Sequence, residues 1–252
     1  MKAHSDCRVR LVTVAVGVAG FLGATIVPAA AQDVSINFGA GGGLTERVIQ
    51  LIALLTVLSL APSILVMMTS FTRIVVVLSL LRTALGTATA PPNAVIVSLA
   101  LFLTAFVMGP ALQNAYDTGV RPLINNEIGT EQAFERASLP LRAFMQKNVR
   151  DKDLQLFTDL SRETPAARPE DMSLRVLVPA FMISELKRAF EIGFLLFLPF
   201  LIIDLVVASV LMAMGMMMLP PVVVSLPFKL IFFVLVDGWS LVAGSLIQSY
   251  GV

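Results

Sequence analysis

The chain has very little of the chemistry that an enzyme or a metal site uses. Its 252 residues include one cysteine, Cys7, and one histidine, His4. Both precede an apolar run that is typical of a secretory signal peptide. Once that segment is removed, thiol nucleophiles, disulfides, histidine bases and Cys/His zinc sites are excluded. The phosphate-binding pattern GxxxxGK[ST] does not occur either, so we expect no enzymatic activity and no cofactor.

The signal peptide is predicted from three successive features. Basic residues in MKAHSDCRVR come before the apolar residues 11–27, and the helix breaker Pro28 follows them. Ala29 and Ala31 then form the small-residue pattern that signal peptidase recognises. We therefore expect cleavage after Ala31, which makes Gln32 the first residue of the mature chain. The alternative is an uncleaved first membrane helix.

Charged residues are also scarce. Only 14% of the residues are charged and 57% are hydrophobic, with a mean hydropathy of +0.86. A soluble domain carries about 25% charged residues, so this chain is predicted to use membrane lipid as its solvent. The signal peptide holds three basic residues and one acidic residue, so 18 basic and 17 acidic residues become 15 and 16 after cleavage. This near-neutral balance argues against a nucleic acid partner.

Long apolar runs take the place of these missing features. Each of four runs has about the 20 residues that a helix needs to cross the hydrocarbon layer: residues 48–68, 93–112, 193–214 and 222–247. The alternation of a membrane β-barrel is not visible, and α-helices are the other structure that satisfies the backbone in lipid. The predicted fold class is an all-α integral membrane protein with about four apolar helices in two hairpins and a small helical extracytoplasmic domain.

The chain is predicted to divide into four consecutive parts: a cleavable signal peptide at 1–31, a first hydrophobic hairpin at 44–112, a helical periplasmic domain at 113–187, and a second hydrophobic hairpin with a methionine-rich turn at 188–252. From residue 173 the pattern favours one long helix, kinked at Pro199. Amphipathic spacing in the third part predicts helices that need a packing partner, and we expect this domain to contact other copies of the chain.

The connection between the first two apolar runs, TSFTRIVVVLSLLRTALGTATAPP, contains Arg73 and Arg82 and no acidic residue. The positive-inside rule therefore predicts a cytoplasmic location. The connection is itself apolar and too short to span a bilayer. We expect it to form a helix that packs on a partner or re-enters the membrane.

Three charged residues lie inside the apolar runs: Asp204 in the third, and Lys229 and Asp237 in the fourth. A charge at this depth is costly and usually faces a partner or a polar cavity. A hairpin turning near residues 219–220 brings Asp204 closer to Asp237 than to Lys229, which argues against an ion pair of Asp204 with Lys229 inside the hairpin. The charges then hold helices together, within or between subunits, or form a proton relay. The lack of histidine disfavours the relay.

The stretch MAMGMMMLPP, residues 212–221, joins the third and fourth runs and holds five methionines within seven residues. Methionine is flexible and polarizable, and it packs against irregular surfaces. Gly215 gives the turn backbone freedom, and the two prolines at 220–221 favour the start of a new helix. Three interpretations remain open: an adaptable seal, a thioether site of a Cu(I) permease, and a turn that only faces lipid.

Three long segments, PAFMISELKRAFEIGF (179–194), MGMMMLPPVVVSLPFKLIFFVLVDGW (214–239) and TSFTRIVVVLSLLRTALGTATAPPN (69–93), resemble the signature regions of the FliP family. FliP proteins are membrane components of the flagellar type III export gate, related to the R component of virulence secretion systems. The resemblance extends from about Leu44 to Tyr250, and its motifs are long and specific.

The resemblance implies a function and a set of partners. Several copies would assemble with two smaller membrane export-gate subunits into a closed helical cone in the bacterial inner membrane, at the flagellar basal body. Unfolded flagellar substrate proteins would pass through it. The methionine turns would narrow the channel, which makes Met216, Met217 and Met218 the expected pore gasket. The protein would then be a multi-pass homo-oligomer without catalytic or metal-binding residues.

Overall fold

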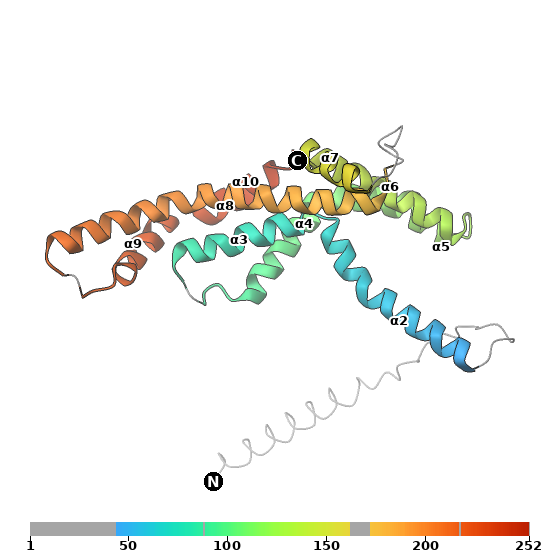
Figure 1. Ribbon diagram of the computed structural model, residues 1–252, viewed down its shortest axis with the longest axis horizontal. Helices are drawn as coiled ribbons and strands as arrows, with labels where there is room; N and C mark the ends of the chain where they lie inside the picture. Colours follow the sequence, from blue (N-terminus) through green and yellow to red (C-terminus); the bar gives the residue numbers. More distant parts are fainter. Residues whose placement is uncertain (1–43, 88, 162–171, 217, 252) are drawn as a thin grey trace, which may run out of the picture. The chain divides into compact units, whose positions relative to one another are not determined.

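The computed structural model describes residues 44–87, 89–161, 172–216 and 218–251 (Figure 1). The cleavage-site residues Ala31 and Gln32 lie outside these ranges, as does Met217. Every regular element within the ranges is a helix, which confirms the predicted all-α fold class. The elements are α2 (Leu44–Met67), α3 (Phe71–Leu85), α4 (Asn93–Ala115), the π-helix η1 (Tyr116–Val120), α5 (Arg121–Ile124), α6 (Thr130–Asn148), α7 (Asp151–Ser161), α8 (Leu174–Ala213), α9 (Pro221–Leu235) and α10 (Gly238–Gln248).

The chain divides into two compact units, residues 1–53 and 54–252. The elements from α3 to α10 belong to the second unit. The longest of them is α8, a single helix of 40 residues that contains Pro179 and Pro199. This confirms the long helix predicted from residue 173, and the kink at Pro199 stays a prediction. The boundary predicted between residues 187 and 188 falls inside this uninterrupted helix, and the division into domains stays a prediction.

Helix α3 packs along α8 (Figure 1). The two helices run in the same direction, because Arg73 near the start of α3 pairs with Glu185, whereas Leu80 lies against Gly193 further along α8. A Cβ atom at Gly193 would lie 2.3 Å from Leu80 Cδ1, so glycine permits the close approach. The apolar connection of the sequence analysis is thus a core helix whose packing partner is α8 of the same chain.

Two hairpins point the same way along α8, and the one formed by α8 and α9 reaches further (Figure 1). The first joins α3 to α4 through residues 86–92, and Arg82 donates a hydrogen bond to Asn93 Oδ1 across it. The second joins α8 to α9 through residues 214–220. One apolar core lies between them and is formed by Ile74, Val77, Leu78, Leu81, Ala84, Leu85, Ile96, Ala100, Ala189, Phe200, Phe233, Val242 and Leu246.

Helices α6 and α7 cover the first part of α8. After α4, η1 and α5, the chain reverses and α6 packs back on η1, where Gly119 lies against the backbone of Ala133 and Ala137. A second core holds α6 to α8 and is formed by Met145, Val149, Leu177, Ala180 and Phe181. The region predicted as a separate outer domain therefore packs on the same long helix as the second hairpin.

Two helical segments in the described residues are long and apolar enough to cross a membrane, Asn93–Ile124 and Leu174–Ala213. A third candidate is the pair α9 and α10, which meet at an angle of 62°. The prediction of one helix over residues 222–247 was therefore wrong. Asp237 has φ 49° and ψ 52°, a left-handed conformation that ends α9 and starts α10.

Candidate functional site

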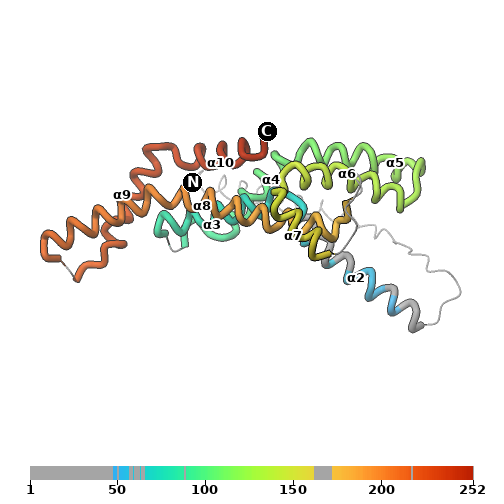
Figure 2. The backbone as a smooth tube through the Cα atoms, turned by 45° about the horizontal axis from the view of Figure 1, so that its top comes forward, coloured from blue at the N-terminus to red at the C-terminus, as the bar shows by residue number. Residues whose placement is uncertain are grey.

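The methionine turn begins with a well-defined helix stop (Figure 2). The amide of Met216 donates to the carbonyl of Leu211 at 3.0 Å, and the amide of Gly215 donates to the carbonyl of Met212 at 3.0 Å. Gly215 has φ +74°. This is the Schellman arrangement, in which a left-handed glycine lets the chain satisfy the last helical carbonyls and leave the helix. The prediction that Gly215 and the prolines shape the turn is consistent with this geometry.

The side chains of Met216 and Met218, the described methionines after Gly215, are exposed. Met216 is 42% exposed and Met218 is 100% exposed. Large apolar side chains gathered on a surface in this way indicate contact with lipid or with other polypeptides. Next to the turn, α8 and α9 enclose an open cavity of about 480 Å³ with an apolar lining. Its lining residues are Ile202, Ile203, Val206, Val207, Val210, Leu211, Met214, Val224 and Phe228.

The two arms of this hairpin are joined by an ion pair that the sequence analysis argued against. Lys229 Nζ lies 2.7 Å from Asp204 Oδ2, and Ser225 donates to Asp204 Oδ1 at 2.6 Å. The error came from the assumed position of the turn. The connection spans residues 214–220, so its centre is Met217, and Asp204 and Lys229 lie 13 and 12 residues from that centre.

Lys229 also connects the hairpin to α3. Its Nζ atom donates to the carbonyl of Ala84 at 3.2 Å, in the last turn of α3. The ammonium group therefore satisfies a carbonyl at the negative end of the α3 dipole while it neutralises Asp204. With only 4% of its surface exposed, Lys229 is buried among three helices. We call Asp204, Lys229 and the Ala84 carbonyl the hairpin brace.

Asp237, the third predicted charge, does not join the hairpin brace. It is exposed and occupies the N-cap position of α10, and its side chain makes no capping hydrogen bond. Among the described residues, no hydrogen bond or ion pair of its carboxylate is present. The structure thus brings two of the three predicted charges together and leaves the third apart.

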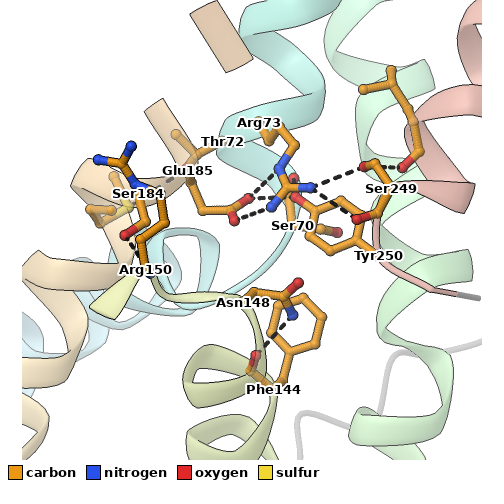
Figure 3. Close-up of polar contacts among 12 residues, drawn as sticks. Ser70, Thr72, Arg73, Phe144, Asn148, Arg150, Ser184, Glu185, Ser249 and Tyr250 are labelled. Carbon is orange, nitrogen blue, oxygen red and sulfur yellow. Dashed lines mark hydrogen bonds and ion pairs between the residues drawn. The ribbon is translucent and has the colours of Figure 1, made fainter. Parts of the chain in front are cut away.

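A second buried charge cluster was missed by the sequence analysis (Figure 3). Arg73 Nε donates to Glu185 Oε2 at 2.9 Å, Nη2 contacts the other carboxylate oxygen, and both side chains are at most 1% exposed. The guanidinium carbon lies 3.8 Å from the ring centre of Tyr250, whose hydroxyl bonds to Glu185. Arg73 Nη1 bonds to Ser249 Oγ at 3.0 Å. These contacts attach the C-terminal end of the chain to α3 and α8.

Two signals in the sequence point to this cluster in retrospect. Glu185 is an acidic residue inside an apolar helix, and Arg73 is a basic residue inside an apolar segment, so each requires a partner. Arg73 was used only to predict a cytoplasmic location for its segment, and no partner was proposed for its side chain, which is 1% exposed. Tyr250 gave no such signal. Its burial, reinforced by the charge of Glu185, raises its pKa, so the phenol remains a neutral hydrogen-bond donor.

A third polar cluster lies one residue earlier on α8. Ser184 donates to Asp153 Oδ2 at 2.7 Å, and the Arg150 side chain donates to both oxygens of Asp153. The backbone amide of Arg150 donates to Ser184 Oγ at 3.1 Å (Figure 3). Burial alone would raise the pKa of Asp153, but the hydrogen bonds from Ser184 and Arg150 and the charge of Arg150 outweigh it and lower the pKa. This cluster fastens α7 to α8.

These features define an all-α membrane protein in which a long axial helix carries a hairpin with a methionine turn, held by buried ion pairs. Comparison with known proteins identifies the family. Residues 54–246 match the model of the FliP family. The chain belongs to the FliP family.

Three relatives support this assignment over 80% or more of the chain. The flagellar biosynthetic protein FliP of Caulobacter vibrioides is 59% identical over 99% of this chain and 93% of its own length. The FliP protein of Rhizobium meliloti is 52% identical over 92% of this chain and 94% of its own length. That of Bacillus subtilis is 54% identical over 80% of this chain and 91% of its own length.

Proposed function

We propose that this chain is a core, channel-forming component of the flagellar type III protein export gate in the bacterial inner membrane. Several copies and two smaller membrane subunits would enclose a channel at the flagellar basal body, through which unfolded axial proteins pass. Membership of the FliP family and the names of the relatives, flagellar biosynthetic proteins, support the role in flagellar export. The apolar helices support a location in the membrane.

The observation that carries the channel role is the position of the methionine turn. Helix α3 ends at Leu85, next to the hairpin brace. From Asp204, α8 continues for nine residues to Ala213, which is about 14 Å of helix. The hairpin therefore extends beyond the end of α3 (Figure 2). The turn at its tip includes Met214, Met216 and Met218. A tip of this kind from each copy would meet its neighbours on the axis of a ring.

Methionine suits a seal that opens for many different polypeptides. Its unbranched thioether side chain changes shape at low cost and packs against varied surfaces. A ring of such side chains excludes ions by packing and by dewetting of the constriction. Met216 and Met218 are exposed and available for this contact, and Met217 between them is the third proposed gasket residue.

Replacing Met216, Met217 and Met218 together by alanine tests the proposal. The change removes most of three flexible side chains in a turn that lies outside both apolar cores. We expect a complex that still assembles and a membrane that leaks small ions, measured as ion flux in vesicles and as growth at raised salt. A Cu(I) titration of the wild-type protein tests the copper interpretation on the same sample.

Met145→Ala is the matched control for loss of folding. Met145 is 0% exposed in the core between α6 and α8. Its truncation is expected to cost roughly 2–5 kcal/mol of stability and to lower the yield of complex without producing a leak. A triple variant that assembles and stays ion-tight contradicts the gasket. If the triple variant fails to assemble, as expected for the Met145 control, the methionines of the turn have a packing role instead.

A further inference from the structure

Accessible sulfur is concentrated at the methionine turn. Four described methionines at or beside the turn are exposed: Met212, Met214, Met216 and Met218. Met108 and Met145, in the interior, are 0% exposed. The single cysteine of the sequence, Cys7, precedes the described residues, which therefore contain no thiol that competes for an oxidant. Because the oxidation of sulfur side chains follows their exposure, the methionines of the turn are expected to react first.

Oxidation of a methionine changes its polarity with little change in its size. The thioether sulfur attacks one oxygen of hydrogen peroxide, so that an S–O bond forms and the O–O bond breaks. The leaving hydroxide takes up the proton of the transferred oxygen and departs as water. The sulfur loses two electrons, and the peroxide gains them. The product is a sulfoxide, whose oxygen is a polar hydrogen-bond acceptor on a side chain that was apolar before.

The backbone of the turn has few donors for a sulfoxide oxygen. Pro220 and Pro221 have no amide hydrogen. Four amides of the turn already donate to backbone carbonyls: those of Met214, Gly215, Met216 and Leu219. An acceptor added at the tip therefore finds little backbone with which to pair.

Side-chain donors near the turn are also few, and they are already used. Between Asp204 and Lys229 the sequence contains no charged residue, and its only hydroxyl or amide side chains are those of Ser209 and Ser225. Ser209 donates to the carbonyl of Leu205 at 2.8 Å, and Ser225 donates to Asp204 Oδ1 at 2.6 Å. Burying an unpaired polar oxygen is costly, so water must hydrate a sulfoxide in this turn.

We propose that the methionine turn is a site of oxidation by peroxide, and that sulfoxides at Met216 and Met218 open the seal to ions. This inference rests on the proposed channel function, because a hydrated ring of sulfoxides no longer excludes ions as a dewetted ring of thioethers does. The hydrogen bonds of the Schellman arrangement join backbone atoms, so they remain when the side chains are oxidised. The hairpin therefore keeps its fold while its tip changes from apolar to hydrated.

The first measurement locates the oxidation. Membrane vesicles that contain the full chain, assembled with its native partners, are treated with hydrogen peroxide. Peptide mass spectrometry then follows the gain of one oxygen atom at each methionine. We expect Met216 and Met218 to react at least about tenfold faster than Met108 and Met145, because a buried thioether reacts only when the surrounding structure opens. Equal rates at the four positions overturn the proposal, whether or not the chain forms a channel.

The second measurement connects oxidation with the seal. Peroxide should raise the ion flux of wild-type vesicles several-fold. The rise should be lost when Met216, Met217 and Met218 are all replaced by leucine, which is apolar, similar in volume and free of sulfur. Met67→Leu, at an exposed methionine outside the turn, is the matched control and should keep the full rise. Each variant is compared with its own untreated vesicles, so a changed basal flux does not affect the result.

The outcomes separate this inference from the proposed function. If the turn is oxidised and wild-type vesicles stay ion-tight while the triple alanine variant leaks, the gasket holds and the oxidation proposal is overturned. If neither leaks, both are overturned. A rise in flux that persists in the triple leucine variant places the sensitive sulfur elsewhere and also overturns the proposal. If that variant fails to assemble, Met218→Leu, at the fully exposed position, takes its place, and an undiminished rise has the same meaning.

Discussion

Lys229 and Asp204 form an ion pair between the two arms of the methionine hairpin, with 2.7 Å between Nζ and Oδ2. The same ammonium group donates to the carbonyl of Ala84 at the end of α3. One side chain therefore links both arms of the methionine hairpin to the end of α3, beside the apolar core that the two hairpins share.

Lys229→Met is expected to destabilise the protein substantially. The substitution leaves Asp204 without its cation and the end of α3 without its cap. Loss of one partner of a buried ion pair costs roughly 3–5 kcal/mol of stability. Because the Asp204 side chain is 29% exposed, we expect a cost at or below the lower end of this range. Thermal unfolding in detergent, followed by the fluorescence of Trp239, the only tryptophan, measures the effect. Adding Asp204→Asn should restore part of the loss, and a purely additive result would contradict the pairing.

Gly119→Ala is expected to disturb the contact between η1 and α6. The new Cβ atom would lie 2.7 Å from the carbonyl oxygen of Ala133 and 2.8 Å from the amide nitrogen of Ala137, both backbone atoms that cannot rotate away. Overpacking of this kind costs about 1–3 kcal/mol. Gly109→Ala in α4 is the control, because nothing lies within 4 Å of its Cβ position. The control should be neutral or slightly stabilising, since alanine favours helices. Equal thermal midpoints for the two variants would contradict the close contact.

Much of this architecture follows from local sequence features. The prolines at 91–92 predict the start of α4 at Asn93, and the long apolar pattern after residue 173 predicts α8. The break at Asp237 was missed because the apolar pattern continues on both sides of it. The signal was the Asp-Gly pair inside that pattern, which favours a turn.

The ion pairs depend on information that local patterns do not contain. Arg73 and Glu185 are 112 residues apart in sequence, and only the packing of α3 on α8 brings them together. The pairing of Asp204 with Lys229 depends on where the turn is centred, and an error of about three residues there changes the partner. An apolar residue pattern predicts which segments are buried, whereas the register between them comes from tertiary packing.

Asp153 is expected to make stability depend on pH in the acidic range. Its pKa is below the ordinary value of 3.8 because of Ser184 and Arg150, so the folded state favours the ionised carboxylate. That contribution is complete above pH 4 to 5 and is lost as the pH falls through the lowered pKa. Asp153→Asn should therefore lower the thermal midpoint at pH 7 and flatten its decline below pH 4. Asp159→Asn, at an exposed position on α7, is the control and should keep the wild-type dependence of the thermal midpoint on pH.

The C-terminal cluster allows a graded series of substitutions at Arg73, Glu185 and Tyr250. Tyr250→Phe removes one hydrogen bond to a charged group and keeps the stacking on Arg73 and Phe144, whose ring centre lies 5.8 Å away. It should cost about 1.5–3 kcal/mol. Arg73→Met leaves Glu185 buried and unpaired, and it should cost more, roughly 3–5 kcal/mol. The double variant Arg73→Met with Glu185→Gln should recover part of that loss, because no uncompensated charge remains.

The thermal midpoints of the three variants, compared at equal amounts of protein in the membrane, give the order of destabilisation. If Tyr250→Phe destabilised the protein as strongly as Arg73→Met, the hydroxyl and not the ion pair would be the main link between the C-terminal end and α8.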